Sequence, residues 1–202
     1  MTCLIGLAFV LWFVVFVIRP FNFWLSMTCT TVLLSLLSTC LGFPLFKKKE
    51  CSLANLILGI TSALVLYGIF RLGNFALSQV NVWFLPDRAD DIRAVYANRG
   101  SMSPLLVGSL LFFPIGFGEE IFWRGFIQRQ LSFRMRSGYA LLLGTLFYTA
   151  VHIPTGNVML ILAAFCCGLF WGGLCLASNS VVPALISHMI WDPLIFVAAP
   201  IQ

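Results

Sequence analysis

Five long stretches without a single Asp, Glu, Lys or Arg most constrain what this chain can fold into. They are Met1–Ile18, Pro20–Phe46, Cys51–Phe70, Gly100–Gly118 and Ser137–Ser187. A membrane-spanning helix needs about 20 mainly apolar residues, so these stretches hold several spans and the last is long enough for two. Only 9% of the 202 residues are charged, against roughly a quarter in soluble domains. This composition excludes a soluble domain, a disordered chain, a nucleic-acid-binding domain and a secreted disulfide scaffold.

The apolar stretches and the turn residues between them predict an all-α fold, a polytopic transmembrane helical bundle of about seven spans. The predicted spans are Cys3–Ile18, a segment within Phe21–Phe46, Ser52–Phe70, Pro104 to about Gln130, Gly138–His152, Val158–Ala177 and Val181 to about Ala198. The only extended polar region, Arg71–Ser103, predicts a connector outside the membrane with a short amphipathic helix on the bilayer surface.

Two clusters of basic residues indicate the orientation of the bundle. Lys47, Lys48 and Lys49 form one cluster, and Arg129, Arg134 and Arg136 form the other. An excess of Lys and Arg marks cytoplasmic loops, so both clusters are predicted to lie inside. Seven spans then place the N-terminus in the cytoplasm and the C-terminus outside, in an integral protein of the plasma (inner) membrane.

Ionisable side chains inside membrane spans are costly, and each is therefore a candidate functional residue. Both histidines of the chain, His152 and His188, lie in its apolar C-terminal half. Three of the seven acids join them, namely Glu119, Glu120 and Asp192. Any one of these residues alone is as well explained by a structural role, but their concentration in three adjacent spans indicates a functional site.

Helical spacing assigns these residues to faces. Glu120 and Arg124 stand four apart with the acid first, which is the favourable order for an intrahelical ion pair. Glu119 then points about 100° away around the helix and has no intrahelical partner. Residues four apart share a helix face, as do His188 with Asp192 and Tyr148 with His152.

Depth along the helices brings the same groups together. If the turn lies near Arg136, Glu119 stands 17 residues before it and His152 stands 16 after it. At a rise of about 1.5 Å per residue, the two side chains of an antiparallel hairpin come level. His188 reaches that level if this hairpin projects about two turns into the cytoplasm. The predicted cavity therefore opens toward the cytoplasm.

Other apolar residues are assigned packing roles. Ala164, Gly168 and Gly172 repeat at every fourth position, a pattern of small residues that favours close helix packing. The tryptophans and phenylalanines are predicted to be mostly lipid-facing or interfacial anchors.

The ordered motifs resemble those of the CPBP family of intramembrane proteases, also called the Abi or CAAX-protease family, which includes the CAAX prenyl proteases. Its motifs are EExxxR, FxxxH and HxxxN/D, matched here by Glu119-Glu120-x-x-x-Arg124, Tyr148-x-x-x-His152 and His188-x-x-x-Asp192. Tyr148 replaces the usual Phe, and Asp192 stands where prenyl-protein endopeptidases have Asn and bacterial relatives often have Asp. The resemblance covers residues 104–192. It implies a catalytic core at 104–202, after N-terminal transmembrane helices at 1–70 and a polar connector at 71–103.

The resemblance also implies a mechanism. Glu119 and His152 are expected to position and activate a water for attack on a peptide carbonyl, while His188 and Asp192 stabilise the oxyanion. Glu120, Arg124 and Tyr148 are expected to support them. The expected function is a glutamate-type intramembrane endopeptidase without a cofactor. It would cleave near the C-terminus or leader of a membrane-associated peptide or protein, with or without a lipid.

Three alternatives stay open at this point. Glu119, His152, His188 and Asp192 form an acceptable ligand set for zinc, although the chain has no HExxH motif. The same helices also fit a non-enzymatic immunity or scaffold protein of the membrane. A transporter that uses Glu119 as a proton relay is the third alternative. The expected partners are a membrane-associated substrate and the lipid bilayer, and no nucleic acid.

Overall fold

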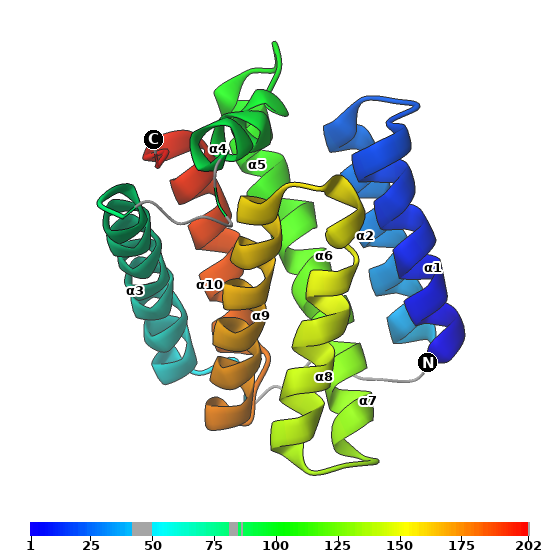
Figure 1. Ribbon diagram of the computed structural model, residues 1–202. Helices are drawn as coiled ribbons and strands as arrows, with labels where there is room; N and C mark the ends of the chain where they lie inside the picture. The colour runs from blue at the N-terminus through cyan, green and yellow to red at the C-terminus, as the bar shows by residue number, and fades with distance from the viewer. Residues whose placement is uncertain (42–49, 81–84, 86, 202) are drawn as a thin grey trace.

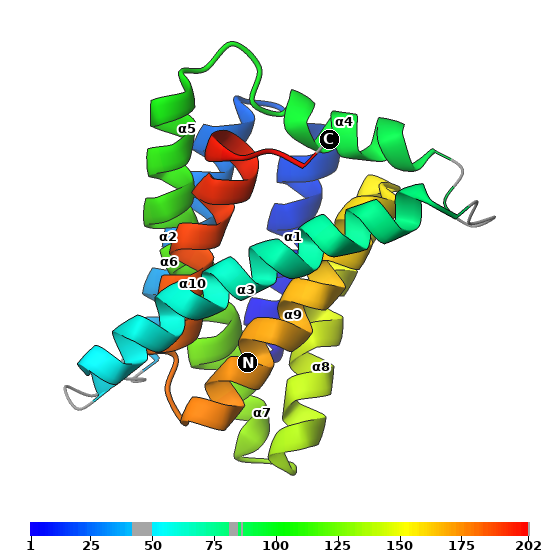
Figure 2. The ribbon, with the colours of Figure 1, turned by 90° about the vertical axis from the view of Figure 1, so that its left-hand side faces the viewer.

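The regular structure of this chain is entirely helical in the computed structural model, which describes residues 1–41, 50–80, 85 and 87–201. Most of the main helices run alongside one another, whereas α3 crosses them obliquely and α4 lies across one end of the bundle (Figures 1 and 2). The α-helices of ten or more residues are α1 (Thr2–Phe13), α2 (Phe23–Cys40), α3 (Leu53–Ser78), α4 (Arg88–Ala97), α8 (Ser137–Ala150), α9 (Val158–Ser178) and α10 (Val182–Pro193). The predicted all-α bundle is confirmed.

All seven predicted spans are helical where the structure describes them. By length and composition, four helices in the described part of the chain can cross a membrane: Phe23–Cys40, Leu53–Ser78, Pro104–Ser132 and Val158–Ser178. Two further apolar helices are shorter, Thr2–Ile18 and Val182–Ala198. They include the π-helical segments η1 (Val14–Ile18) and η6 (Leu194–Ala198).

The predicted polar connector begins later than expected. Helix α3 continues past Phe70 to Ser78, because the residues after Phe70 carry only one charge and include good helix formers. The short helix expected in the connector is α4. Asp91 connects α4 to the bundle, because the Asp91 carboxylate accepts a hydrogen bond from the backbone N–H of Met159 at the start of α9.

The predicted fourth span is interrupted, which the sequence analysis did not anticipate. Phe113 has extended backbone angles, φ −151° and ψ 126°, and Pro114 follows it. A proline inside a helix removes one hydrogen bond and clashes with the preceding turn, so the helix breaks here. The segments on either side are α5 (Pro104–Leu110), η3 (Leu111–Gly116), α6 (Phe117–Glu120), η4 (Ile121–Gln128) and α7 (Arg129–Ser132).

Glycines bring the helix of α6 close to its neighbours. A Cβ on Gly116 would lie 3.3 Å from the Cα of Met189 on α10, and one on Gly118 would lie 3.0 Å from Thr31 on α2. Only a residue without a side chain permits these approaches. The two glutamates that follow Gly118 are thereby held between α2 and α10.

The predicted small-residue face of α9 is confirmed by its contact with α8. A Cβ on Gly168 would lie 2.8 Å from Cγ2 of Thr145 and 3.3 Å from its Cβ. Thr145 is buried and short, so it cannot move aside. We expect Gly168→Ala to lower the free energy of unfolding by about 1–3 kcal/mol, the usual cost of overpacking.

The control for this prediction is Gly173→Ala on the same helix, where an added Cβ meets nothing within 4 Å. Chemical unfolding of the two variants in detergent micelles measures the difference. Equal stability of Gly168→Ala and Gly173→Ala would contradict the close α8–α9 packing.

The tryptophans correct the sequence-based expectation. Five of them have an exposed fraction of 7% or less, namely Trp12, Trp24, Trp123, Trp171 and Trp191. They are core residues and not lipid-facing anchors.

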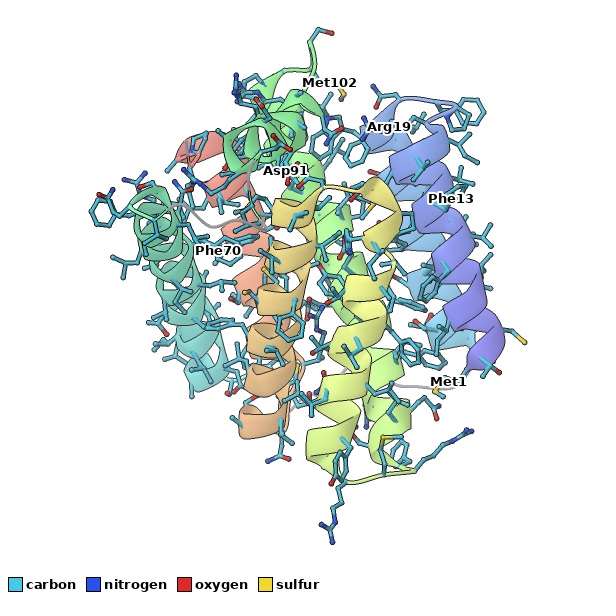
Figure 3. The ribbon with its side chains drawn as sticks, in the orientation of Figure 1. Met1, Phe13, Arg19, Phe70, Asp91 and Met102 are labelled. Carbon is cyan, nitrogen blue, oxygen red and sulfur yellow. The ribbon has the colours of Figure 1, made fainter. Side chains whose placement is uncertain are left out.

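The two ends of the bundle are distinguishable. Met1 and the turn between α7 and α8 lie at one end, which we call the N-terminal end, whereas Met102, α4 and the C-terminus lie at the opposite end, the α4 end (Figures 1 and 3). Helix α2 ends and α3 begins at the N-terminal end (Figure 1). Lys47, Lys48 and Lys49 lie outside the described residues.

Candidate active site

One cavity of about 420 Å³ collects the side chains that the sequence singled out. Its lining includes Glu119, Tyr148, His152, His188 and Asp192. The remaining lining is mostly apolar and comes chiefly from α2, α3, α4, α9 and α10 and from the segments η1, η3 and η6. The predicted convergence of three helices on one cavity is what the structure shows, and the catalytic roles of these residues remain a prediction.

Glu119 is the buried acid without an ion-pair partner on its own helix. Its Oε2 has no hydrogen-bond partner among the residues that the structure describes. The side chain of Tyr148 interacts with the Glu119 carboxylate, and His188 and Asp192 are close enough to influence its charge. A buried carboxylate oxygen with an unused lone pair is available to a small polar ligand such as water.

Glu120 joins two helices through one oxygen atom. Its Oε1 accepts a hydrogen bond from Nη1 of Arg124 at 2.8 Å, which confirms the predicted intrahelical pair. The same Oε1 lies 2.8 Å from Nδ1 of His188 on α10. All three side chains are almost completely buried. Glu120 therefore holds both its own helix and a candidate catalytic histidine.

His188 lies between two carboxylates. Its Nε2 is 3.2 Å from Oδ2 of Asp192, while its Nδ1 faces Glu120. Ionised carboxylates only accept hydrogen bonds, so this arrangement calls for a proton on each ring nitrogen. Trp171 stacks on the imidazole with ring centroids 3.8 Å apart. A positive charge is thus held at the cavity wall, close to Glu119.

His152 has a different hydrogen-bond pattern. Its Nδ1 lies 2.8 Å from the backbone oxygen of Tyr148, and its Nε2 lies 3.4 Å from the indole Nε1 of Trp12. The carbonyl requires a proton on Nδ1 and the indole N–H requires a lone pair on Nε2. His152 is therefore a neutral imidazole in a single tautomer.

The supporting residues form an aromatic layer. The guanidinium of Arg124 lies 4.5 Å from the ring centre of Tyr148 and 5.4 Å from that of Trp171. Contact with ring faces stabilises a cation. Arg124 is thereby fixed between the two rings while it donates to Glu120.

Sequence reasoning missed three contributors to this site. They are the link from Glu120 to His188, the stacking of Trp171 and the contact of Trp12 with His152. Trp12 and His152 are separated by 140 positions, so spacing carried no signal for their contact. For Trp171, the sequence offered a single indication of a packing role, namely that it lies on the same predicted helix as the small-residue face.

The cavity lies toward the α4 end of the bundle. Its lining includes Ile92, Val95 and Tyr96 of α4 together with Ile201 near the C-terminus. The sequence predicted a cytoplasmic N-terminus and a cavity that opens toward the cytoplasm. The N-terminus lies at the opposite end (Figure 1), and both parts of the orientation stay predictions.

The zinc alternative concerns Glu119, His152, His188 and Asp192. In the part of the chain that the structure describes, no three His, Cys, Asp or Glu side chains are arranged to hold a metal ion. Both nitrogens of His188 face carboxylates, and both nitrogens of His152 have other partners. The imidazoles would have to reorient to become ligands.

Comparison with known proteins identifies the part of the chain that carries the site. A family model described as type II CAAX prenyl endopeptidase, Rce1-like, matches residues 101–194. Neither the curated proteins nor the solved structures include a match. The matched segment begins just before α5 and ends after Asp192, so it contains all three motifs, while α1 to α4 lie outside it. Residues 101–194 of this integral membrane chain are thus similar to the Rce1-like CAAX protease family.

Proposed function

We propose that this protein is a glutamate-type intramembrane endopeptidase. The observation that carries the proposal is the convergence of Glu119, His152 and the His188–Asp192 pair on one cavity with apolar walls. These groups include an acid with an unused oxygen, a neutral imidazole and a held positive charge. They are the groups that hydrolysis of a peptide bond by an activated water requires.

The proposed reaction begins with a water held by Glu119 and His152. Glu119 removes a proton while the water oxygen bonds to the carbonyl carbon, and the carbonyl electrons form an oxyanion. The His188 imidazolium, oriented by Asp192 and Glu120, stabilises that oxyanion. When the C–N bond breaks, Glu119 returns the proton to the leaving amine. No redox partner is needed, and every proton is accounted for.

The proposed substrate is a peptide or protein anchored in the membrane by a lipid near its C-terminus. Apolar side chains from α3, α4 and α9 extend the cavity well beyond the polar groups, as an aliphatic chain beside a scissile bond would need. The family description names prenylated substrates for the relatives. A bacteriocin leader and the C-terminal anchor of a sorted surface protein are the competing substrates.

The function is tested with purified protein in liposomes and a peptide that ends in a farnesylated cysteine followed by three residues. We expect mass spectrometry to detect release of the three-residue product, at least tenfold faster than from the same peptide with an unmodified cysteine. Equal rates would contradict the lipid requirement. Absence of product from every peptide would favour the non-enzymatic immunity or scaffold alternative.

We propose that the reaction needs no metal ion, since the hydrogen bonds of both imidazoles support a direct role for these side chains. Activity is then expected to survive incubation with a strong chelator. A loss that added zinc restores would favour the zinc-dependent version of the same protease.

We propose the plasma membrane as the location, with the N-terminal end in the cytoplasm. Arg134 and Arg136 lie in the turn between α7 and α8 at that end, in support of this orientation. The α4 end of the cavity then faces the opposite side of the membrane.

A further inference from the structure

Trp12 is one of three buried residues on α1, together with Ile5 and Ala8. The neighbouring Val10 and Phe13 have exposed fractions of 60% and 43%, whereas that of Trp12 is 1%. Helix α1 lies outside the matched segment 101–194. The indole makes a hydrogen bond from α1 to His152 of the candidate active site, from outside the family region.

The indole N–H of Trp12 is aimed at a nitrogen of a candidate catalytic residue. It donates to Nε2 of His152 at 3.4 Å, and the contact is buried. The opposite nitrogen, Nδ1, donates to the Tyr148 carbonyl at 2.8 Å. A ring flip would replace both nitrogens by C–H groups and lose both hydrogen bonds. Trp12 and the Tyr148 carbonyl together determine the orientation and the tautomer of the imidazole.

Aromatic rings enclose the imidazole on its other sides. Phe16, one turn after Trp12, and Tyr148 each lie edge-on to His152 with ring centroids 5.4 Å apart. Trp123 packs edge-on against Trp12 at 5.7 Å and against Tyr148 at 5.5 Å. This enclosure leaves the His152 ring little freedom to rotate, and it keeps bulk water from the side of α1.

The length of the Trp12 contact determines how it can act. A distance of 3.4 Å exceeds the usual 2.7–3.2 Å of a strong N–H hydrogen bond. A long hydrogen bond from the indole orients the Nε2 lone pair of His152, but it is weak enough to be replaced by a hydrogen bond from water. A shorter indole bond would compete more strongly with water for the same lone pair.

We propose that Trp12 is a positioning residue for His152, an inference that rests on the proposed function. The indole N–H keeps the imidazole neutral, in the Nδ1–H tautomer, with the lone pair of Nε2 directed at Trp12. The arriving water takes over that lone pair when substrate binds. Helix α1 is thus part of the active site, although the family region does not include it.

Because the chain has two histidines, ¹⁵N labelling of the imidazoles tests the proposal without any substrate. In the wild-type protein we expect His152 to show a protonated Nδ1 and an unprotonated Nε2, assigned by the loss of these signals in His152→Gln. An Nε2–H tautomer in the wild type would overturn the proposal, whether or not any Trp12 variant folds.

Two matched variants identify the source of the effect. Trp12→Phe keeps an aromatic ring and removes the indole N–H, so we expect the Nε2 resonance of His152 to shift toward that of a free lone pair. Trp123→Phe makes the same change in the same cluster, but Nε1 of Trp123 has no hydrogen-bond partner among the described residues. We expect this control to leave the resonance in place. An equal shift in both variants would assign the effect to packing.

Kinetics provides the functional readout. Loss of one hydrogen bond of ordinary net strength changes a rate or equilibrium constant by about 2- to 10-fold. We therefore expect Trp12→Phe to lower kcat by this factor and to leave KM within about twofold of the wild type. A higher kcat would overturn positioning, because it would mean that the indole blocks His152. If Nε2 responds to Trp12→Phe but no peptide is cleaved, the proposed function fails and the placement of His152 stands. If peptides are cleaved and Nε2 does not respond, only the role of Trp12 fails.

Discussion

Glu119→Gln is expected to lower kcat for peptide hydrolysis by about a thousandfold, within the range that removal of a general base produces. Glutamine has nearly the same shape as glutamate, so the cavity keeps its volume and its contact with Tyr148. The amide cannot accept the proton of the attacking water or return it to the leaving amine. Single-turnover rates with the farnesylated peptide in liposomes measure the chemical step apart from product release.

The matched control for this experiment is Glu50→Gln. Glu50 precedes α3 and accepts a hydrogen bond from the hydroxyl of Ser180 at 2.9 Å, outside the cavity. The chemical change is the same, and we expect kcat to stay within about twofold of the wild type, since one partly buried hydrogen bond contributes little. Full activity in Glu119→Gln would contradict the glutamate mechanism. An equal loss in both variants would attribute the effect to stability.

Local patterns in the sequence predicted the elements of the fold well, because each helix is determined by residues within it. The apolar runs locate α9 and the continuous helix of α10 and η6 (Val182–Ala198) to within one or two residues of their ends. The break at Phe113 had a visible cause in Pro114, but the uncharged stretch around it favoured a continuous span. A proline inside an apolar run is a stronger signal of a broken helix than the length of the run is of a continuous one.

The site divides in the same way. Spacing within one helix predicted the pairs Glu120–Arg124 and His188–Asp192, which the structure contains. The contact between Glu120 and His188 joins two helices and depends on how closely they approach, which Gly116 and Gly118 permit. Tertiary contacts of this kind have no fixed spacing in the sequence. Sequence spacing therefore could not predict the contacts of the site that connect different helices.

The burial of the tryptophans was mispredicted for a related reason. Indole rings are common at membrane interfaces, and composition alone favours that position. In this bundle Trp171 packs between helices instead, where its ring stacks on His188. Packing volume, which the sequence does not show directly, decided the position of these residues.

The largest loss of stability is expected from Glu120→Ala. The alanine leaves Arg124 and His188 buried without the oxygen that both of them contact at 2.8 Å. Breaking a buried ion pair by removing one partner typically costs about 3–5 kcal/mol, because the remaining charge stays desolvated. Unfolding by denaturant in detergent micelles, followed by tryptophan fluorescence, measures the free energy of unfolding. The five buried indoles make that signal sensitive to the loss of the core.

Two comparisons show whether buried charge causes this loss. Asp90→Ala removes the carboxylate that pairs with Arg93 on the surface of α4, where both side chains are largely exposed, and we expect a cost below about 1 kcal/mol. The double variant Glu120→Leu/Arg124→Met removes both members of the buried pair, so it should recover part of the stability lost in Glu120→Ala. Recovery stays partial because His188 still lacks its partner on Nδ1. If the double variant were less stable than Glu120→Ala, Arg124 would be stabilised mainly by Tyr148 and Trp171, and Glu120 would serve chiefly to hold His188.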